Sequence, residues 1–528
     1  MLLPGERMGW TLTDLSLVLL VAVILIIAEY KSWSSHWSFI NIYRILGKGT
    51  KVLKEPKTIK DVPGPVALPV FGTRWLYSVG GYKMNKIHEL YAGEVDLFRK
   101  YGETVREEAL WNFPVINIRN RDDIERVLKQ SSKFPIRPPN EVTSYYRRTR
   151  PDKYTNLGLV NEQGQTWHDL RTKLTPALTS SKTMTQFLPE LNQVADDFNT
   201  LITNSRDENG VVHNFEEYAN RMGLESTCTL ILGERLGFLE QNISPVASRL
   251  ADAVKGQFIA SRDTFYGLPF WKILPTPAYK RLVESEDTIY EIISEMVDKT
   301  LKAETNKCAV DPVQSVFMSI LQAEGMELCD KKAAIIDFIA AGIKTLGNTL
   351  VFLLYLVAKH PEVQEKIYEE LEGLVTDGCP LSTSTLRHAT YLKACIAEAF
   401  RVLPTAPCVA RILESETELS SYLLPAGSVV LCHTWLASQE ECNFVDAKSF
   451  KPERWLDNSA VRYPFLVCPF GVGKRMCPGK RFVELELQVV LAQTVRKFHI
   501  DFDEELDLQF EFLLAPKSPT NIILRDRH

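Results

Sequence analysis

Cysteine is sparse in this chain of 528 residues, and the spacing of its ten cysteines excludes two kinds of protein. No two cysteines form a C-x-x-C pair, so the sequence gives no support for a structural zinc site. Ten cysteines are also too few for a disulfide scaffold, and several lie in apolar stretches, where a free thiol behaves as a small hydrophobe. We therefore expect the chain to fold in a reducing compartment.

Nucleotide-binding motifs and linkers are missing as well. No G-x-G-x-x-G follows a predicted strand, and the pair Gly473-Lys474 lacks the Ser or Thr that would complete a P-loop. The chain has no recognisable site for NADPH or flavin, so any redox reaction that it performs must draw electrons from a partner. It has no long Gly, Ser or Pro run and no repeat, which favours one large domain. The net charge of −5 gives no reason to expect nucleic acid.

The N-terminal segment differs from the rest. Leu15 to Ala28 is uncharged but spans only 14 residues, fewer than the roughly 20 that cross a bilayer. It suits the core of a signal anchor or an interfacial segment, and a buried helix is the alternative. A basic stretch and then Val62-Pro63-Gly64-Pro65 follow, and these prolines favour an extended, stiff joint. We predict a membrane-anchoring leader over residues 1–60 and a catalytic domain over residues 61–528.

Helical patterns dominate the predicted domain. Residues 332–360 form the longest candidate, apolar nearly all round and therefore buried. Asp337, Lys344, Thr345 and Asn348 interrupt it, and buried polar groups indicate a cavity, ligand or water. Further helices are predicted over 361–376, 390–403 and 479–498, and short strands between Arg411 and Val430. The predicted fold class is mainly α with small β-sheets.

The strongest motif runs from Phe470 to Gly479, FGVGKRMCPG. Its first two glycines allow a tight bend and a close approach to a flat cofactor. Arg475 can neutralise a carboxylate, and Cys477 precedes a predicted helix, whose N-terminus favours a thiolate. Phe470 can shield the sulfur from water, and Gly479 leaves room beside it. The alternative is an ordinary glycine-rich turn with a buried cysteine.

This segment resembles the F-x-x-G-x-R-x-C-x-G motif of the cytochrome P450 family, at five fixed positions. The resemblance implies the cytochrome P450 fold. It also implies haem b (iron protoporphyrin IX) buried between the long central helix and the cysteine loop, with Cys477 as axial ligand of the iron. The implied reaction is reductive activation of O₂ and insertion of one oxygen atom into a C–H bond.

Three further motifs match the family in the same order along the chain. Glu398 and Arg401 form its E-x-x-R pair, and Arg454, in the segment FKPERW, occupies the position that joins this pair near the cysteine loop. The resemblance gives these three residues a structural role. A surface ion pair is the alternative for Glu398 and Arg401 alone.

The resemblance also implies a set of groups that hold the haem propionates. Trp167 and Arg171 match the W-x-x-x-R of the family, and Arg411 follows Pro407 where the family places another arginine. Arg475 completes the set. Together with Cys477, Phe470 and Gly479, these residues are the predicted cofactor site.

The central helix departs from the family at one position. The family pattern (A/G)-G-x-(D/E)-T reads Ala341-Gly342-Ile343-Lys344-Thr345 here, with lysine in place of the acid. Gly342 is expected to open the helix beside the haem, and Thr345 to supply a hydroxyl near bound O₂. Lys344 either relays protons, if burial lowers its pKa, or points away towards a carboxylate. The departure raises two alternatives, an O₂-independent isomerase or dehydratase and a non-enzymatic haem sensor.

Several segments resemble the mitochondrial, ferredoxin-dependent branch of the family: Glu225-Ser226 with GERLG at 233–237, LPFWKILPTPAYKRL at 268–282, and GKR at 479–481 followed by ELE at 484–486. This implies electrons from an adrenodoxin-like ferredoxin and its NADPH reductase. A basic face of Lys393, Lys480, Arg481, Arg496 and Lys497 would suit an acidic ferredoxin. Ala397 stands where that branch usually has a second basic residue.

The leader agrees less well with that branch. Glu6, Asp14 and Glu29 flank its apolar part, unlike an acid-poor mitochondrial transit peptide. We expect the mitochondrial inner membrane. The alternatives are the endoplasmic reticulum membrane with the microsomal P450 reductase, or both membranes.

Within the branch, residues 340–350 (AAGIKTLGNTL) resemble the ecdysone 20-hydroxylases of insects. The resemblance implies a steroid substrate, ecdysone, hydroxylated at C20 to give 20-hydroxyecdysone. The alternative is another mitochondrial-type steroid or xenobiotic hydroxylase.

Overall fold

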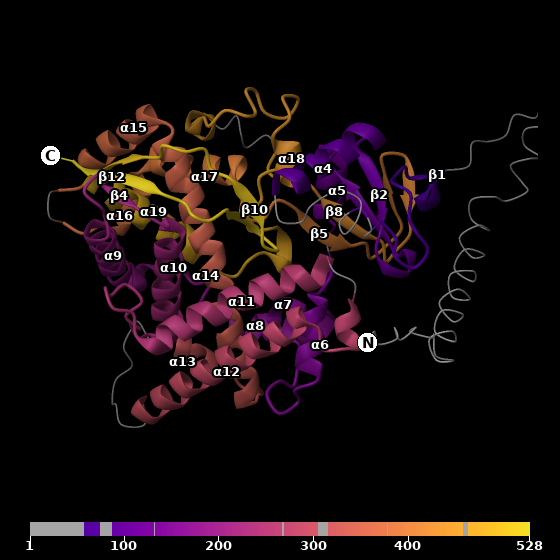
Figure 1. The fold of residues 1–528 in the computed structure, drawn as a ribbon, viewed down its shortest axis with the longest axis horizontal. Coiled ribbons are helices and arrows are strands. Elements are labelled where there is room, and N and C mark those ends of the chain that lie inside the picture. Colours follow the sequence, from indigo (N-terminus) through magenta and orange to yellow (C-terminus); the bar gives the residue numbers. More distant parts are fainter. Residues whose placement is uncertain are drawn as a thin grey trace, which may run out of the picture.

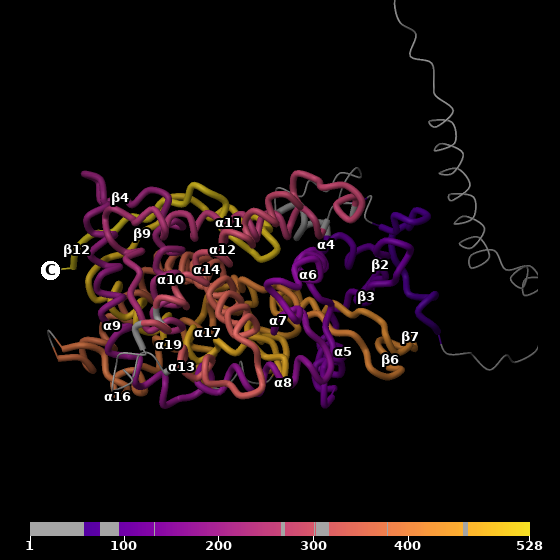
Figure 2. Tube along the Cα trace, turned by 90° about the horizontal axis from the view of Figure 1, so that it is seen from below, coloured from indigo at the N-terminus to yellow at the C-terminus, as the bar shows by residue number. Residues whose placement is uncertain are grey.

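The structure is a computed structural model that describes residues 57–73, 76, 87–130, 132–266, 269–304, 315–376, 379–457 and 463–527. The predicted leader, apart from its last four residues, lies outside the described residues. In Figures 1 and 2, the sheet-rich part with α4 (Ile87–Tyr101), α5 (Arg121–Leu128) and β2 (Thr104–Glu108) lies at the end of the molecule opposite the C-terminus.

Helices make up most of the described chain, as the sequence predicted. Besides α4 and α5 they are α6 (Glu141–Arg148), α7 (Gly158–Asn161), α8 (Gly164–Leu174), α9 (Ser181–Asn204), α10 (Phe215–Leu232), α11 (Pro245–Tyr266), α12 (Pro277–Glu304), α13 (Ser315–Leu321), α14 (Leu328–Ala358), α15 (Pro361–Glu372), α16 (Thr383–His388), α17 (Thr390–Val402), α18 (Thr434–Ser438) and α19 (Lys480–Lys497). Short 3₁₀ helices are η1 (Ile59–Asp61), η2 (Leu110–Asn112), η3 (Pro269–Lys272), η5 (Pro452–Trp455) and η7 (Gly473–Arg475).

The sheets are small and mixed. Strand orders are β2-β3-β8-β5, β1-β7-β6, β4-β12-β9 and β10-β11, and β3 pairs in parallel with β8. The strands other than β2 are β1 (Lys57–Thr58), β3 (Pro114–Ile118), β4 (Val211–Val212), β5 (Val409–Ile412), β6 (Thr417–Leu419), β7 (Tyr422–Leu424), β8 (Val429–Cys432), β9 (Phe498–Asp501), β10 (Leu508–Phe510), β11 (Leu514–Pro516) and β12 (Ile522–Asp526). The strands predicted between Arg411 and Val430 are confirmed.

The helix predicted over 332–360 is confirmed as α14, which begins four residues earlier and ends two residues earlier. Pro361 is the first residue of α15, where a missing N–H costs no helical hydrogen bond. Within the described residues, α14 is the one helix long and apolar enough to cross a membrane. Most of its apolar side chains are buried in the main core, so α14 is the central helix of the fold (Figure 1).

Glycines let α10 pack closely on α14. A Cβ on Gly342 would lie 2.4 Å from the hydroxyl oxygen of Thr227 on α10, and a Cβ on Gly347 would lie 2.4 Å from Asn220 Oδ1. Neither distance is tolerable between non-bonded atoms, so both positions require glycine. The sequence analysis expected Gly342 to open α14. The structure gives Gly342 a packing contact with α10, and the expected opening beside the haem stays a prediction.

A carboxyl group of α19 is buried against α10. Glu486 on α19 is 3% exposed, and its described hydrogen-bond partner is the Ser226 hydroxyl on α10, at 2.9 Å. Burial raises the pKa of Glu486 to about 8 from an ordinary 4.5, although the Ser226 hydrogen bond opposes this. At neutral pH the folded protein therefore holds Glu486 protonated.

Glu486→Gln is expected to stabilise the protein in a pH-dependent manner. Between pH 4.5 and about 8, the unfolded chain ionises Glu486 and the folded chain does not, so raising the pH favours unfolding of the wild type. The variant removes this effect, which is of the order of 3 kcal/mol at pH 7. Urea unfolding at pH 5 and pH 8 measures the difference. The exposed Glu369→Gln is the control, and an equal effect of Glu486→Gln at both pH values would contradict the argument.

Candidate functional site

The Cys477 loop is closed by backbone hydrogen bonds. The Cys477 amide donates to the Phe470 carbonyl at 2.8 Å, and the Gly471 amide donates to Cys468 at 2.8 Å. Gly471 and Gly473 both have φ +70°, in the left-handed region that favours glycine. The Phe470 ring packs edge-on against Phe400 of α17 at 5.2 Å, which anchors the loop to the helical core.

Groups that stabilise a thiolate surround the sulfur. Burial raises the pKa of the Cys477 thiol, while the Gly479 and Lys480 amides and the positive charges of Arg171 and Arg137 lower it. A Cβ on Gly479 would contact Cys477 Sγ at 3.7 Å, so glycine leaves space on this side of the sulfur. Because α19 begins at Lys480, Pro478 lies in the turn that precedes the helix.

Cys477 also has accessible surface, although burial is the main influence on its pKa. A side chain can be surrounded by protein and still have accessible surface where it lines a space inside the protein. The centre of α14 behaves similarly, since Ala341 is exposed between Ala340 and Ile343, which are buried. Both elements thus present accessible surface within the folded part of the molecule.

Four arginines gather around the Cys477 loop, and we call Arg137, Arg171, Arg411 and Arg475 the guanidinium cluster. Arg475 is 8% exposed, and its guanidinium carbon lies 4.0 Å from the centre of the Trp167 ring. Burial, with the charges of the other three, lowers the pKa of Arg475 to about 9. Among the described residues, no member of the cluster forms an ion pair with a carboxylate, and Arg475 Nη1 is buried without a hydrogen-bond partner.

Backbone contacts tie the cluster to the loop. Arg171, one helical turn after Trp167 on α8, donates to the Met476 carbonyl at 2.9 Å. Arg411 on β5 donates to the Val472 carbonyl at 3.2 Å. The structure thus brings Trp167 and three predicted arginines to the cysteine loop. Like charges so close together are stable only with an anionic partner, and the two propionates of a haem fit this donor set.

The sequence analysis missed Arg137. Burial and the charge of Arg411 lower its pKa, whereas the nearby Cys477 raises it. It donates to the Val160 carbonyl from Nε at 3.2 Å and from Nη2 at 2.8 Å. Arg137 stands in an irregular segment with no periodicity and no motif, so the sequence carried no signal for it.

Glu398, Arg401 and Arg454 also come together, in a group that we call the Glu398 brace. Glu398 is fully buried and accepts from Arg401 at 2.7 and 2.9 Å and from Arg454 at 2.9 Å. The indole of Trp455, which the sequence analysis did not single out, donates to it at 2.9 Å. Arg401 also donates to the carbonyls of Ser438 and Ser449 at 3.0 and 2.9 Å. The brace fastens α17 to η5.

On α14, the Thr345 hydroxyl donates to the Ala341 carbonyl at 2.7 Å. Lys344 Nζ lies 3.1 Å from Glu511 Oε2, in the turn between β10 and β11. Of the two orientations that the sequence left open for Lys344, the structure shows the one towards a carboxylate. Glu511 is 167 residues away in sequence, and nothing in its local pattern indicated this pairing.

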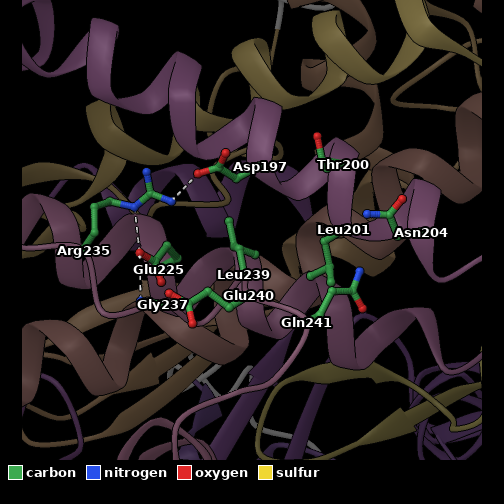
Figure 3. Close-up of a pocket in the computed structure, with 10 residues that line it drawn as sticks. All are labelled: Asp197, Thr200, Leu201, Asn204, Glu225, Arg235, Gly237, Leu239, Glu240 and Gln241. Carbon is green, nitrogen blue, oxygen red and sulfur yellow. Dashed lines mark hydrogen bonds and ion pairs between the residues drawn. The ribbon is translucent and has the colours of Figure 1, made fainter.

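A separate cavity of about 410 Å³ lies between α9, α10 and the loop that follows α10 (Figure 3). Its walls include Glu225, which is fully buried and accepts from Arg235 Nε at 2.7 Å and from the Phe238 amide at 2.5 Å. Arg235 also binds Asp197 at 2.7 Å. The GERLG segment therefore serves to hold this loop, and the cavity lies apart from Cys477.

Glu398→Gln is expected to reduce folding and cofactor retention more than turnover. The change leaves Arg401 and Arg454 buried with reduced charge compensation, which typically costs about 3–5 kcal/mol. We expect a lower yield of haem-loaded protein and a lower Tm, with near-normal turnover per haem. Glu372→Gln, which breaks a more exposed pair with Arg496, should change Tm little. Normal Tm with reduced turnover would argue instead for a catalytic role of the brace.

Comparison with known proteins shows that nearly the whole chain is similar to one protein family. Residues 62–524 match the cytochrome P450 family. The chain is 44% identical to ecdysone 20-monooxygenase of Drosophila melanogaster, over 97% of this chain and 100% of that protein. It is 29% identical to mitochondrial cytochrome P450 302a1 of the same species, over 89% and 96% of the two chains. It is 28% identical to the mitochondrial 1,25-dihydroxyvitamin D(3) 24-hydroxylase of Mus musculus, over 84% and 85%. The chain therefore belongs to the cytochrome P450 family of haem-thiolate monooxygenases.

Proposed function

We propose that this monooxygenase hydroxylates ecdysone at C20 and releases 20-hydroxyecdysone. The observation that carries the proposal is the 44% identity to an ecdysone 20-monooxygenase along essentially the full length of both chains. The match of residues 340–350 to insect ecdysone 20-hydroxylases, on the central helix, agrees with it.

The proposed cofactor is haem b, held by residues from four parts of the chain. Cys477 is the proposed iron ligand. Burial raises the pKa of its thiol, and the surrounding amides and arginines oppose this rise. The proposed propionate ligands are Trp167, Arg171, Arg411 and Arg475, to which we add Arg137. Phe470 and Gly479 shape the space around the sulfur. When bound, thiolate-ligated haem supplies the reductive activation of O₂ and the transfer of one oxygen atom.

Residues of α14 are proposed to manage protons. The Thr345 hydroxyl, which now donates to its own helix, can turn to donate to an oxygen atom beside α14. Gly342, by admitting α10, fixes the position of this helical turn. Lys344 points towards its counter-ion Glu511 and lies one residue before Thr345. This combines the two alternatives that the sequence left open: the Lys344–Glu511 pair is the proposed proton source in place of the usual acid.

An adrenodoxin-like ferredoxin with its NADPH reductase is the proposed electron donor, at the mitochondrial inner membrane. The basic side chains offered for docking lie on α17 and α19, which pack together. Two of the five are partly neutralised, because Arg496 pairs with Glu372 at 3.1 Å and Lys480 lies 3.8 Å from Glu484. Lys393, Arg481 and Lys497 form no ion pair with a described residue, so they carry most of the proposed attraction.

The test is turnover of ecdysone by the purified haem-loaded protein with a ferredoxin and its reductase. We expect 20-hydroxyecdysone as product, and little product when the microsomal P450 reductase replaces the ferredoxin system. The matched control is Cys477→Ala, which should abolish both product and the shifted Soret band of the reduced, CO-bound haem. Absence of any hydroxylated ecdysteroid from the wild type would refute the proposed substrate.

Lys344→Ala tests the proton path. Removing the ammonium group should lower, severalfold, the fraction of consumed O₂ that appears as hydroxylated product, with the remainder released as peroxide or water. Lys359→Ala, at the end of the same helix and paired with Glu505 at the surface, is the control. Unchanged coupling in Lys344→Ala would exclude Lys344 from proton delivery.

A further inference from the structure

The turn between β10 and β11 holds a buried carboxylate against the central helix. Glu511 begins this turn, and its amide donates to the Leu513 carbonyl at 2.8 Å. The next residue, Phe512, has φ +67°, a strained conformation for a non-glycine residue. The side chains of Glu511 and Lys344 are 11% and 12% exposed. Their ion pair therefore forms inside the protein rather than on its surface.

Two contacts one helical turn apart fix this hairpin, residues 508–516, on a single face of α14. The Lys344–Glu511 ion pair is the first, and the second is a hydrogen bond of 2.9 Å from the Asn348 side chain to the Leu514 carbonyl. The Leu514 amide in turn donates to Thr405 at 2.9 Å. The Glu511 carboxylate is thus held in place before any ligand binds.

One oxygen of this carboxylate keeps room for a further hydrogen bond. Oε1 accepts from the Gln509 side chain at 3.1 Å. Oε2 is buried and lies 3.1 Å from Lys344 Nζ, and no other described group donates to it. Because a carboxylate oxygen has two lone pairs, Oε2 can accept one more hydrogen bond, from a water or a ligand.

The position of Glu511 points to the substrate rather than to water alone. Lys344 directly precedes Thr345, and Ala341 has exposed surface one turn earlier at the centre of α14. On its other side, the turn is packed by Phe512 against Phe265 near the end of α11, with ring centroids 5.3 Å apart. Oε2 of Glu511 therefore lies beside the stretch of α14 at which the proposed reaction occurs.

We propose that Glu511 Oε2 accepts a hydrogen bond from a hydroxyl group of the substrate, and that Lys344 positions this acceptor. The inference rests on the proposed function and deepens it: the site selects neutral, hydroxyl-bearing steroids and disfavours carboxylic acids, whose charge Glu511 would repel. This arrangement also accounts for lysine at position 344, because an acid there would place a second negative charge next to Glu511.

The experiment is a spectral binding titration of the haem-loaded enzyme with ecdysone and with analogues that each lack one hydroxyl group. In the wild type, one analogue should bind about 10–100-fold more weakly than ecdysone, as expected when a charged acceptor loses its donor. In Lys344→Met/Glu511→Leu, where both charges are replaced, ecdysone should bind about 10–100-fold more weakly than it binds the wild type. The analogue should then bind this variant as tightly as ecdysone does. Glu511→Gln, which keeps the shape of the side chain, should give the same pattern with a smaller loss.

Glu504→Leu, on the exposed segment before the hairpin, is the control and should leave every dissociation constant unchanged. The inference would be overturned if the ratio of the dissociation constants of this analogue and ecdysone were the same in the wild type and in both Glu511 variants. The proposed function would survive that result, since it requires only that ecdysone binds and is turned over. A wild type that does not bind ecdysone would overturn the proposed function and this inference with it.

Discussion

The approach of four arginines, one buried and three half-buried, is the constraint on which the site depends. Arg137, Arg171, Arg411 and Arg475 approach one another beside Cys477, and burial lowers the pKa of each of them. Their hydrogen bonds to backbone carbonyls satisfy donors without supplying negative charge. A dianionic cofactor such as the proposed haem would supply that charge and offset the cost of bringing the cluster together, and its binding would then be thermodynamically linked to the folding of this region.

The rest of the fold holds the two sides of the site rigid. On one side, the Glu398 brace fastens α17 to η5, and Phe400 on the same helix packs against the cysteine loop. On the other side, glycines bring α10 against α14, so that α14 has little freedom to slide. Rigid walls matter because a misplacement of about 1 Å at a reacting centre can cost two orders of magnitude in rate.

The sequence predicted those features that depend on local pattern. The long apolar run of α14, the strands after Arg411 and the order of the family motifs each appear in one continuous segment. Arg137 was missed because it stands in no periodic element and no motif. Trp455 lies in the FKPERW segment, but its hydrogen bond to Glu398 joins residues 57 positions apart, so no local pattern indicated it. The pairing of Lys344 with Glu511 could only be posed as one of two alternatives, since tertiary structure selects the partner. The α10 contact of Gly342 was unforeseeable for the same reason.

The arginines around Cys477 come from widely separated stretches, the first at residue 137 and the last at residue 475. During synthesis, therefore, most of the chain exists before the cluster and its cysteine are complete. With the proposed haem site, capture of the cofactor would then be a late event that requires nearly the whole length of the polypeptide. A chain released early from the ribosome would keep much of the helical core but neither Arg475 nor Cys477, and would remain without cofactor. In a cell, cofactor loading would thus act as proofreading, separating complete molecules from truncated ones that proteases can remove.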